Sequence, residues 1–282
     1  MPRPRYLILT TGLIVIAVFG TGCTPLLFQP LREHRFDPAQ AGIVYEEEWF
    51  ESEDGVRLHG WFLPAPHEPH GAVLFLHGNA ENISTHINSV WWLPQAGYDV
   101  LLFDYRGYGK SEGQATLAGL HLDAQAALRR LLAREAERTD RIAVFGQSLG
   151  AAIAVSMLAR APESRRVRAL AVEGIFPEYR AIARDKMAGF WLTAPFNRLL
   201  AYTFDNRFKP GEDITRLPRL PLLVIAGTHD PIVPAVYGRR FHAMAPQPKT
   251  YWEIPHIPHI GAFLAPARRA RFVRWLEEAM AE

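Results

Sequence analysis

The chain has 282 residues, of which 49% are hydrophobic and 21% are charged, the balance of a globular protein that buries a sizeable core. This composition excludes an intrinsically disordered, collagen-like or coiled-coil protein. The net charge is only +2, and two basic residues, Arg3 and Arg5, stand in a segment that we expect to be removed, so a nucleic-acid-binding protein is excluded as well.

Residues 1–22 have the layout of a lipoprotein-type signal peptide. A basic start precedes an apolar run from Tyr6 to Gly20, and small residues then lead to Cys23. A run of 15 residues is shorter than the roughly 20 that a membrane-spanning helix needs. The small residues before Cys23 resemble the lipobox of bacterial lipoproteins, in which this cysteine is lipidated and becomes the N-terminus. A plain signal peptide and an uncleaved membrane anchor are the alternatives.

The lipobox resemblance implies an exported, membrane-anchored bacterial lipoprotein. Thr24 follows the cysteine where inner-membrane lipoproteins carry Asp, which implies the outer membrane, facing the periplasm. Residues 23–42 hold three prolines and no clear periodicity, and are predicted to be a tether. Because Cys23 is the single cysteine, an internal disulfide and a cysteine-based zinc site are excluded.

The domain is predicted to span residues 43–282 and to be a doubly wound α/β fold. Segments 43–51 and 56–63 indicate an antiparallel pair that turns near Gly55. Short apolar runs then alternate with stretches of helical spacing, which favours a mostly parallel sheet covered on both faces. These runs lie at 72–76, 99–103, 142–145, 168–172 and 222–226, and a last strand is predicted at about 249–254.

Residues 175–216 interrupt this alternation and are rich in aromatic and aliphatic side chains. So long a connection favours a helical cap over the site. A helix packed on the sheet as core is the alternative.

The pattern Gly-x-Ser-x-Gly occurs twice, around Ser111 and around Ser148. A nucleophile elbow needs a strand that runs directly into the turn and a helix that begins directly after it. Residues 141–147 read as the strand and residues 149–155 as a helix rich in small residues, so Ser148 is the predicted nucleophile. A loop separates Ser111 from its strand, and Ser111 is predicted to be a turn or cap residue.

The sequence resembles the α/β-hydrolase superfamily at four landmarks. They are Phe75-Leu-His-Gly-Asn-Ala80, Phe103-Asp-Tyr-Arg-Gly-Tyr-Gly109, Gly146-Gln-Ser-Leu-Gly150 and Ala226-Gly-Thr-His-Asp-Pro-Ile-Val-Pro234. The first two look most like the branch that contains protein depalmitoylases and lysophospholipases. The resemblance covers roughly residues 43–280 and implies a serine hydrolase.

The remaining catalytic groups follow from the chain order serine, acid, histidine of this fold. Asp230, after the run 222–226, is the predicted acid, with Glu173 as runner-up. His259 fits the family position of the base, just before the last helix, and His256 stays an alternative. The backbone N–H groups of Asn79 and Leu149 are predicted to form the oxyanion hole.

These residues predict a membrane-tethered serine hydrolase that cleaves carboxylic ester or thioester bonds through an acyl-enzyme on Ser148. Its substrate is expected to be a small-molecule or lipid-like acyl compound, with no cofactor, no metal and no nucleic acid. A metal held by His256 and His259 is not favoured, because no third ligand is evident. A serine peptidase and a catalytically silent lipoprotein that uses the fold for binding are the alternatives.

Overall fold

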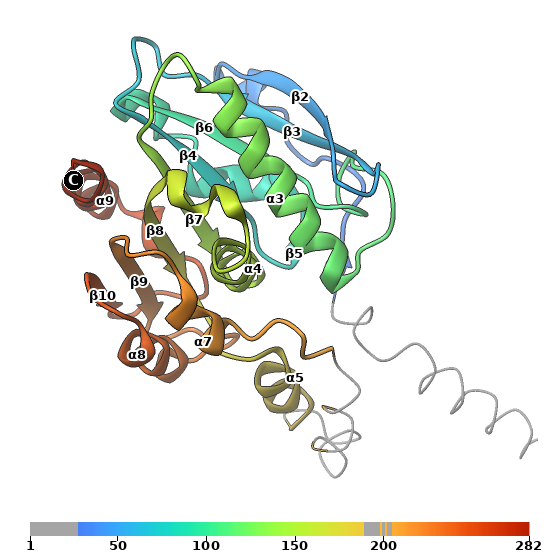
Figure 1. Ribbon diagram of the computed structural model, residues 1–282, viewed down its shortest axis with the longest axis vertical. Helices are drawn as coiled ribbons and strands as arrows, with labels where there is room; N and C mark the ends of the chain where they lie inside the picture. Colours follow the sequence, from blue (N-terminus) through green and yellow to red (C-terminus); the bar gives the residue numbers. More distant parts are fainter. Residues whose placement is uncertain (1–27, 189–197, 199–200, 202–204, 282) are drawn as a thin grey trace, which may run out of the picture.

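The computed structural model describes residues 28–188, 198, 201 and 205–281, and the predicted signal peptide and Cys23 lie outside them. Its centre is an eight-stranded sheet in the order β10-β9-β8-β7-β4-β6-β3-β2 (Figure 1). The strands are β2 (Glu46–Glu51), β3 (Arg57–Leu63), β4 (Gly71–Leu76), β6 (Tyr98–Phe103), β7 (Ile142–Gln147), β8 (Val167–Glu173), β9 (Leu222–Gly227) and β10 (Lys249–Ile254). The predicted strands and the α/β class are confirmed.

Within this sheet β3 runs opposite to its two neighbours, and the pairs from β6 to β10 are all parallel. The predicted antiparallel pair of segments 43–51 and 56–63 is therefore β2 and β3. Strands β4, β6, β7 and β9 are buried along their whole length, and β8 is buried except at Arg168, which explains their largely apolar sequences.

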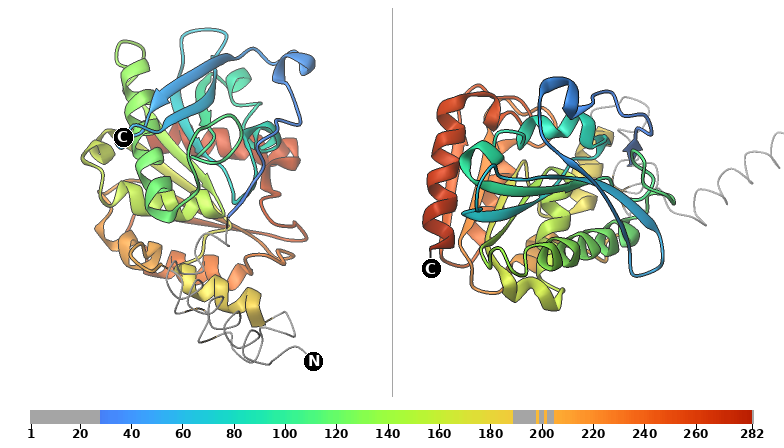
Figure 2. Two further views of the ribbon diagram at one scale, coloured as in Figure 1. Left: turned by 90° about the vertical axis from the view of Figure 1, so that its right-hand side faces the viewer. Right: turned by 90° about the horizontal axis from the view of Figure 1, so that it is seen from above.

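Helices cover both faces of the sheet (Figures 1 and 2). Helices α3 (Leu117–Arg134), α4 (Leu149–Leu158) and α8 (Ala235–Met244) share one core with strand side chains such as Leu74 and Val144. Helix α9 (Pro266–Met280) and the short α2 (Ile83–His86) share the core on the other face, with Phe75 and Phe145. Among the residues that the structure describes, no helix is both long and apolar enough to cross a bilayer.

Two segments beyond the sheet bear on the site. The insertion 175–216 includes α5 (Tyr179–Ala188) and α7 (Pro210–Asp213), whereas its aromatic residues 190, 191, 196 and 202 lie outside the described residues. Residues 28–42, expected to belong to a tether, pack on the domain instead. Their strand β1 (Gln29–Pro30) pairs in parallel with β5 (Ala80–Glu81), and Phe28 is buried.

The difference has a physical reason. Prolines and the lack of periodicity indicate that a segment has no long regular element, but they do not show whether its backbone finds hydrogen-bond partners elsewhere in the chain. Residues 28–35 find theirs in two loops at the end of the sheet where the site lies.

Candidate active site

Ser148 lies in a sharp turn between β7 and α4, as the elbow prediction requires. Its backbone has φ 52° and ψ −113°, a strained conformation for a residue with a side chain, and its N–H donates to the Glu173 carbonyl oxygen at 2.8 Å. The two flanking glycines make the turn possible: a Cβ on Gly146 would lie 2.5 Å from the Gly150 carbonyl oxygen, and one on Gly150 would lie 2.1 Å from the Leu76 carbonyl oxygen.

Asp230 and His259 lie side by side in the loops that follow β9 and β10. His259 Nδ1 donates to Asp230 Oδ2 at 2.7 Å, and Asp230 Oδ1 accepts the backbone N–H groups of Ile232 and Val233 at 2.8 Å each. Gly174, with φ 65°, leaves room for the pair, because a Cβ there would lie 3.0 Å from His259 Cε1. The carboxylate is thus fixed by two donors and orients the imidazole.

The two runner-up residues take other positions. His256 is exposed, its ring packs on His229 with centroids 4.8 Å apart, and its N–H donates to Thr228 Oγ1. Glu173 is buried and accepts hydrogen bonds from the Ala262 N–H at 2.8 Å and from Gln147 Nε2 at 2.7 Å. Burial raises the pKa of Glu173. Glu173 therefore ties the loop of the histidine to β7 and does not contact the His259 ring through any of these bonds.

A cavity of about 460 Å³ joins Ser148 and His259. Asn79 and Leu149 also line it, so all the predicted groups of the site except Asp230, which lies behind His259, face one space. Leu149 is the first residue of α4, where backbone N–H groups lack partners inside the helix. Most of the other lining side chains are apolar: Phe28, Leu117, Phe176, Tyr179, Ile182, Ala183, Ile232, Val233 and Ile260.

The loop that carries Asn79 is held by buried polar groups. His77 Nδ1 donates to the Gly78 carbonyl oxygen at 2.7 Å, and burial lowers the pKa of His77 to about 3, so the ring is neutral. The Tyr108 hydroxyl donates to Asn79 Oδ1 at 3.0 Å. His77 thus has the structural hydrogen-bonding role within the site.

Ser111, in the second Gly-x-Ser-x-Gly pattern, is buried away from the cavity. Its hydroxyl donates to the Asp104 carbonyl oxygen at 2.6 Å and accepts the His59 N–H at 2.9 Å. Both of these bonds hold a turn against β3. The turn interpretation of Ser111 matches these contacts.

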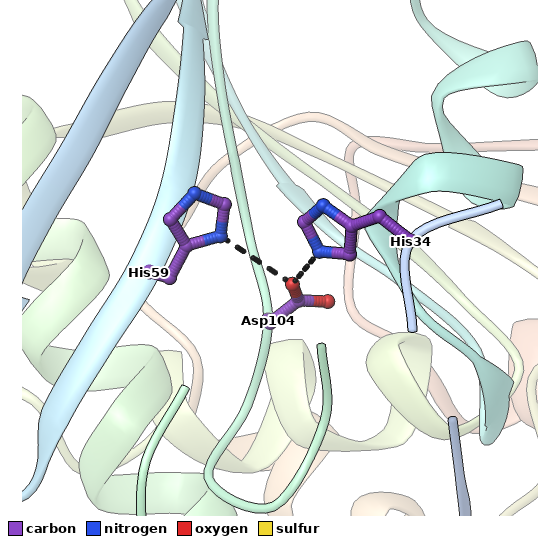
Figure 3. A group of neighbouring side chains, drawn as sticks. All are labelled: His34, His59 and Asp104. Atoms are coloured by element: carbon purple, nitrogen blue, oxygen red, sulfur yellow. Dashed lines mark hydrogen bonds and ion pairs between the residues drawn. The ribbon is translucent and has the colours of Figure 1, made fainter. Parts of the chain in front are cut away.

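A cluster of possible metal ligands lies outside the cavity lining (Figure 3). Within the described part of the chain, ligand atoms of His34, His59 and Asp104 lie within 4.8 Å of one another, a donor set that suits a zinc-like cation by type. Pattern search cannot find it, because the three residues are far apart in sequence and come from different segments.

The contacts of this cluster favour direct hydrogen bonding. His34 Nε2 donates to Asp104 Oδ2 at 2.9 Å, while His59 Nδ1 lies 3.6 Å from the same oxygen. A Cβ on Gly109 would lie 1.9 Å from Asp104 Oδ2, so backbone already fills the space beside the pair. Burial would raise the pKa of Asp104, but the neighbouring His34 and His59 outweigh it and lower the pKa to about 2. We interpret the group as an ionised carboxylate that is hydrogen-bonded to His34 and lies 3.6 Å from the His59 Nδ1 atom.

Comparisons with known proteins show which family the sequence resembles. Residues 67–174 match the family model described as serine aminopeptidase, S33. The chain is 33% identical over 218 residues to YfhR of Escherichia coli (strain K12), and the alignment covers 76% of this chain and 73% of YfhR. It is 32% identical over 252 residues to the alpha/beta hydrolase domain-containing protein WAV2 of Arabidopsis thaliana, which covers 86% and 80%.

A solved structure is similar over nearly the whole domain. The Pyrococcus furiosus esterase Pf2001 superposes with a TM-score of 0.70 at 22% identity, over 90% of this chain and 98% of the esterase. At this identity the likeness concerns the fold.

Proposed function

The chain belongs to the α/β-hydrolase superfamily, and on that premise we propose that it is a serine hydrolase that cleaves carboxylic ester or thioester bonds through an acyl-enzyme on Ser148. The observation that carries the proposal is that His259, hydrogen-bonded to Asp230 at 2.7 Å, lines the same cavity as the strained Ser148. A hydroxyl is a weak nucleophile near neutral pH unless an oriented imidazole removes its proton.

The roles follow from these positions. Asp230 holds the tautomer of His259 in which Nδ1 carries the proton, which leaves Nε2 to accept the proton of Ser148. The serine oxygen attacks the acyl carbon, and the N–H groups of Asn79 and Leu149 stabilise the oxygen on which negative charge develops. His259 then protonates the leaving alcohol or thiol. In the second half of the reaction His259 takes a proton from water, which attacks the acyl carbon, and then returns the proton to Ser148 as the acid is released.

The first test is labelling with a fluorophosphonate together with hydrolysis of short p-nitrophenyl esters. Ser148→Ala is expected to abolish labelling and to lower turnover by several orders of magnitude, because the nucleophile is gone. Ser111→Ala serves as the matched control and should keep most of the turnover of the folded protein. Equal losses in the two variants contradict the assignment of Ser148.

We further propose that the acyl group is lipid-like, as in the depalmitoylase and lysophospholipase branch. The apolar lining of the cavity supports this, since each buried methylene contributes up to about 0.8 kcal/mol. We expect kcat/KM to climb a few-fold per added methylene until the cavity is full, in a panel of esters from two to sixteen carbons below their micelle concentrations. A maximum at two carbons contradicts the lipid-acyl proposal and leaves a small-ester hydrolase.

A serine aminopeptidase is the second candidate, because the matching family model carries that description. An aminopeptidase must bind a protonated amino terminus, which calls for a carboxylate in the pocket. No Asp or Glu is among the described residues that line the cavity. Aminoacyl p-nitroanilides should therefore be cleaved far more slowly than esters, and the reverse order favours the peptidase.

The proposal that the protein is attached to a membrane rests on the sequence of the first 23 residues. We propose that the protein is exported, that Cys23 is lipidated, and that the lipid holds the hydrolase at the outer membrane on its periplasmic side. An apolar cavity suits an enzyme kept near lipids and acylated proteins.

A further inference from the structure

The segment Phe28–Arg35, which we call the N-terminal arm, precedes the first strand of the main sheet and yet reaches the cavity. We propose that this arm is a working part of the active site: it braces the loop that carries Asn79, and its Phe28 side chain sets the size of the acyl chain that the cavity accepts. The inference rests on the proposed function and deepens it.

One side of the arm is bonded to residues 79–84, which we call the oxyanion loop. Strand β1 pairs with β5, and the Leu31 N–H donates to the Glu81 carbonyl oxygen at 3.1 Å. Asn82, which is fully buried, sends its side-chain amide to the carbonyl oxygens of Leu31 and Glu33, at 2.9 and 2.7 Å. The arm therefore pairs with the two residues that directly follow Asn79, Ala80 and Glu81.

The other side of the arm lies on residues 104–113, the loop with the second Gly-x-Ser-x-Gly pattern. The Gly109 N–H donates to the Leu31 carbonyl oxygen at 2.9 Å, and Arg32 binds the carbonyl oxygens of Ser111 and Gly113. His34 reaches the buried Asp104, as Figure 3 shows. Asp104 in turn accepts the Ile83 N–H at 2.9 Å, so arm, loop 104–113 and oxyanion loop close into one hydrogen-bonded unit.

The conformation of Glu81 shows what this unit holds in place. Glu81 has φ 65°, a left-handed conformation that is strained for a residue with a side chain and persists only where neighbours impose it. Its pairing with Pro30 and its bond from Leu31 come from the arm. Without the arm Glu81 is free to relax, and Asn79, two residues earlier, loses its fixed position in the oxyanion hole.

The first residues of the arm also form part of the cavity itself. Phe28 and Gln29 line it together with Tyr179 and Ile182 of the insertion, which come from a distant part of the sequence. The Phe28 side chain is only 9% exposed. Replacing the whole Phe28 side chain with a methyl group therefore lengthens the apolar space available to a substrate. The size of this side chain is the feature by which the arm selects substrates.

The specificity role is tested with Phe28→Ala and a panel of p-nitrophenyl esters from two to sixteen carbons. The chain length with the highest kcat/KM should increase by at least two carbons, because the cavity of the variant holds a longer acyl chain. Phe50→Ala is the matched control, because Phe50 is also partly buried against the same core but does not line the cavity. An unchanged maximum in Phe28→Ala overturns this role.

The bracing role is tested with Leu31→Pro against Leu31→Ala, two variants that lose the same side chain. Only proline removes the N–H that bonds Glu81. We expect kcat for a short ester to fall about tenfold in Leu31→Pro, less than the loss of a whole oxyanion donor, with KM within about twofold. Leu31→Ala, which keeps the N–H that bonds Glu81, should show a clearly smaller loss of kcat than Leu31→Pro. Equal kcat in the two variants overturns the bracing role.

Two measurements keep these tests separate from folding and from the proposed function. Thermal melts compare each pair of variants, and if Leu31→Pro does not fold, His34→Gln replaces it, with the solvent-exposed His67→Gln as its control. A wild type that hydrolyses no ester and takes no fluorophosphonate contradicts the proposed function. A wild type that hydrolyses esters while the arm variants behave as their controls contradicts the arm inference alone.

Discussion

His259 illustrates how a single hydrogen bond distinguishes two histidines three residues apart. Its ring contacts Asp230, whereas the His256 ring packs on His229 at the surface. Two histidines that are close in sequence therefore have different partners: the His259 ring is hydrogen-bonded to a carboxylate, and the His256 ring packs on another imidazole. From the sequence, only the likeness to the family position of the base separated them.

Substitution of the four acidic and basic candidates should divide them into two classes. Asp230→Asn and His259→Ala should each lower kcat by two or more orders of magnitude, because the base loses its orientation or is removed. Glu173→Gln and His256→Ala should stay within about tenfold, since neither side chain contacts His259 Nδ1 in the hydrogen bonds of the site. Ester hydrolysis at saturating substrate measures this; an inactive His256→Ala beside an active His259→Ala reverses the assignment.

At the scale of elements, helix α3 carries a buried histidine on its inner face. His121 Nδ1 donates to the Leu117 carbonyl oxygen at 2.8 Å, and the ring stacks on Phe208 with centroids 3.5 Å apart. Burial lowers the pKa of His121 to about 4. The helix thus packs with a neutral imidazole that the unfolded chain would protonate near its ordinary value.

The consequence is a loss of stability in mild acid. A folded pKa below the unfolded value of 6.5 means that the stabilising contribution of His121 is complete above pH 6.5 and is lost as the pH falls towards 4. Between pH 7 and pH 5 this amounts to roughly 1 to 2 kcal/mol of unfolding free energy. Denaturant unfolding at pH 7 and pH 5 measures this. The decrease in unfolding free energy between the two pH values should be smaller in His121→Gln than in the wild type by that amount, and the exposed His67→Gln is the control. If the unfolding free energy of His121→Gln depends on pH as that of the wild type does, the lowered pKa of His121 is contradicted.

Strands and arm differ in how far the sequence could predict them. A strand such as β7 is buried on both faces, so its own residues must be apolar wherever its neighbours lie, and a local pattern reveals it. The arm is defined by partners 50 to 80 residues away, such as Glu81 and Ser111, and its own sequence has no period. Local patterns therefore predicted a tether where the chain packs against the site.

The site shows the same division. The strand–serine–helix order around Ser148 is local, and it was predicted. The cluster of His34, His59 and Asp104 joins three segments that only the folded chain brings together, and no spacing rule points to it. The roles of Ser148, Asp230 and His259 stay predictions until the variants above are measured.

At the scale of the whole molecule, the proposed lipidation of Cys23 would determine where the protein acts. Lipidation supplies acyl chains to the N-terminus, and stable anchoring takes more than one chain. Cys23→Ala should therefore move the protein from the detergent phase to the soluble fraction or leave an uncleaved precursor, as read by phase partition and intact mass. Ser148→Ala is the control, because it reports whether partition depends on activity. Unchanged membrane retention with the first 22 residues still present shows a signal anchor instead.

The docked arm also fixes how far the catalytic cavity can stand from its anchor. Five residue steps separate Cys23 from Phe28, and a fully extended chain covers at most about 17 Å in that number. If Cys23 carries the lipid, Phe28 and the cavity that it lines stay within that distance of the lipidated residue, and the enzyme acts only close to the membrane surface. Catalysis then becomes a two-dimensional encounter, whose rate is set by the surface density of acyl substrates and by their lateral diffusion instead of by their concentration in solution.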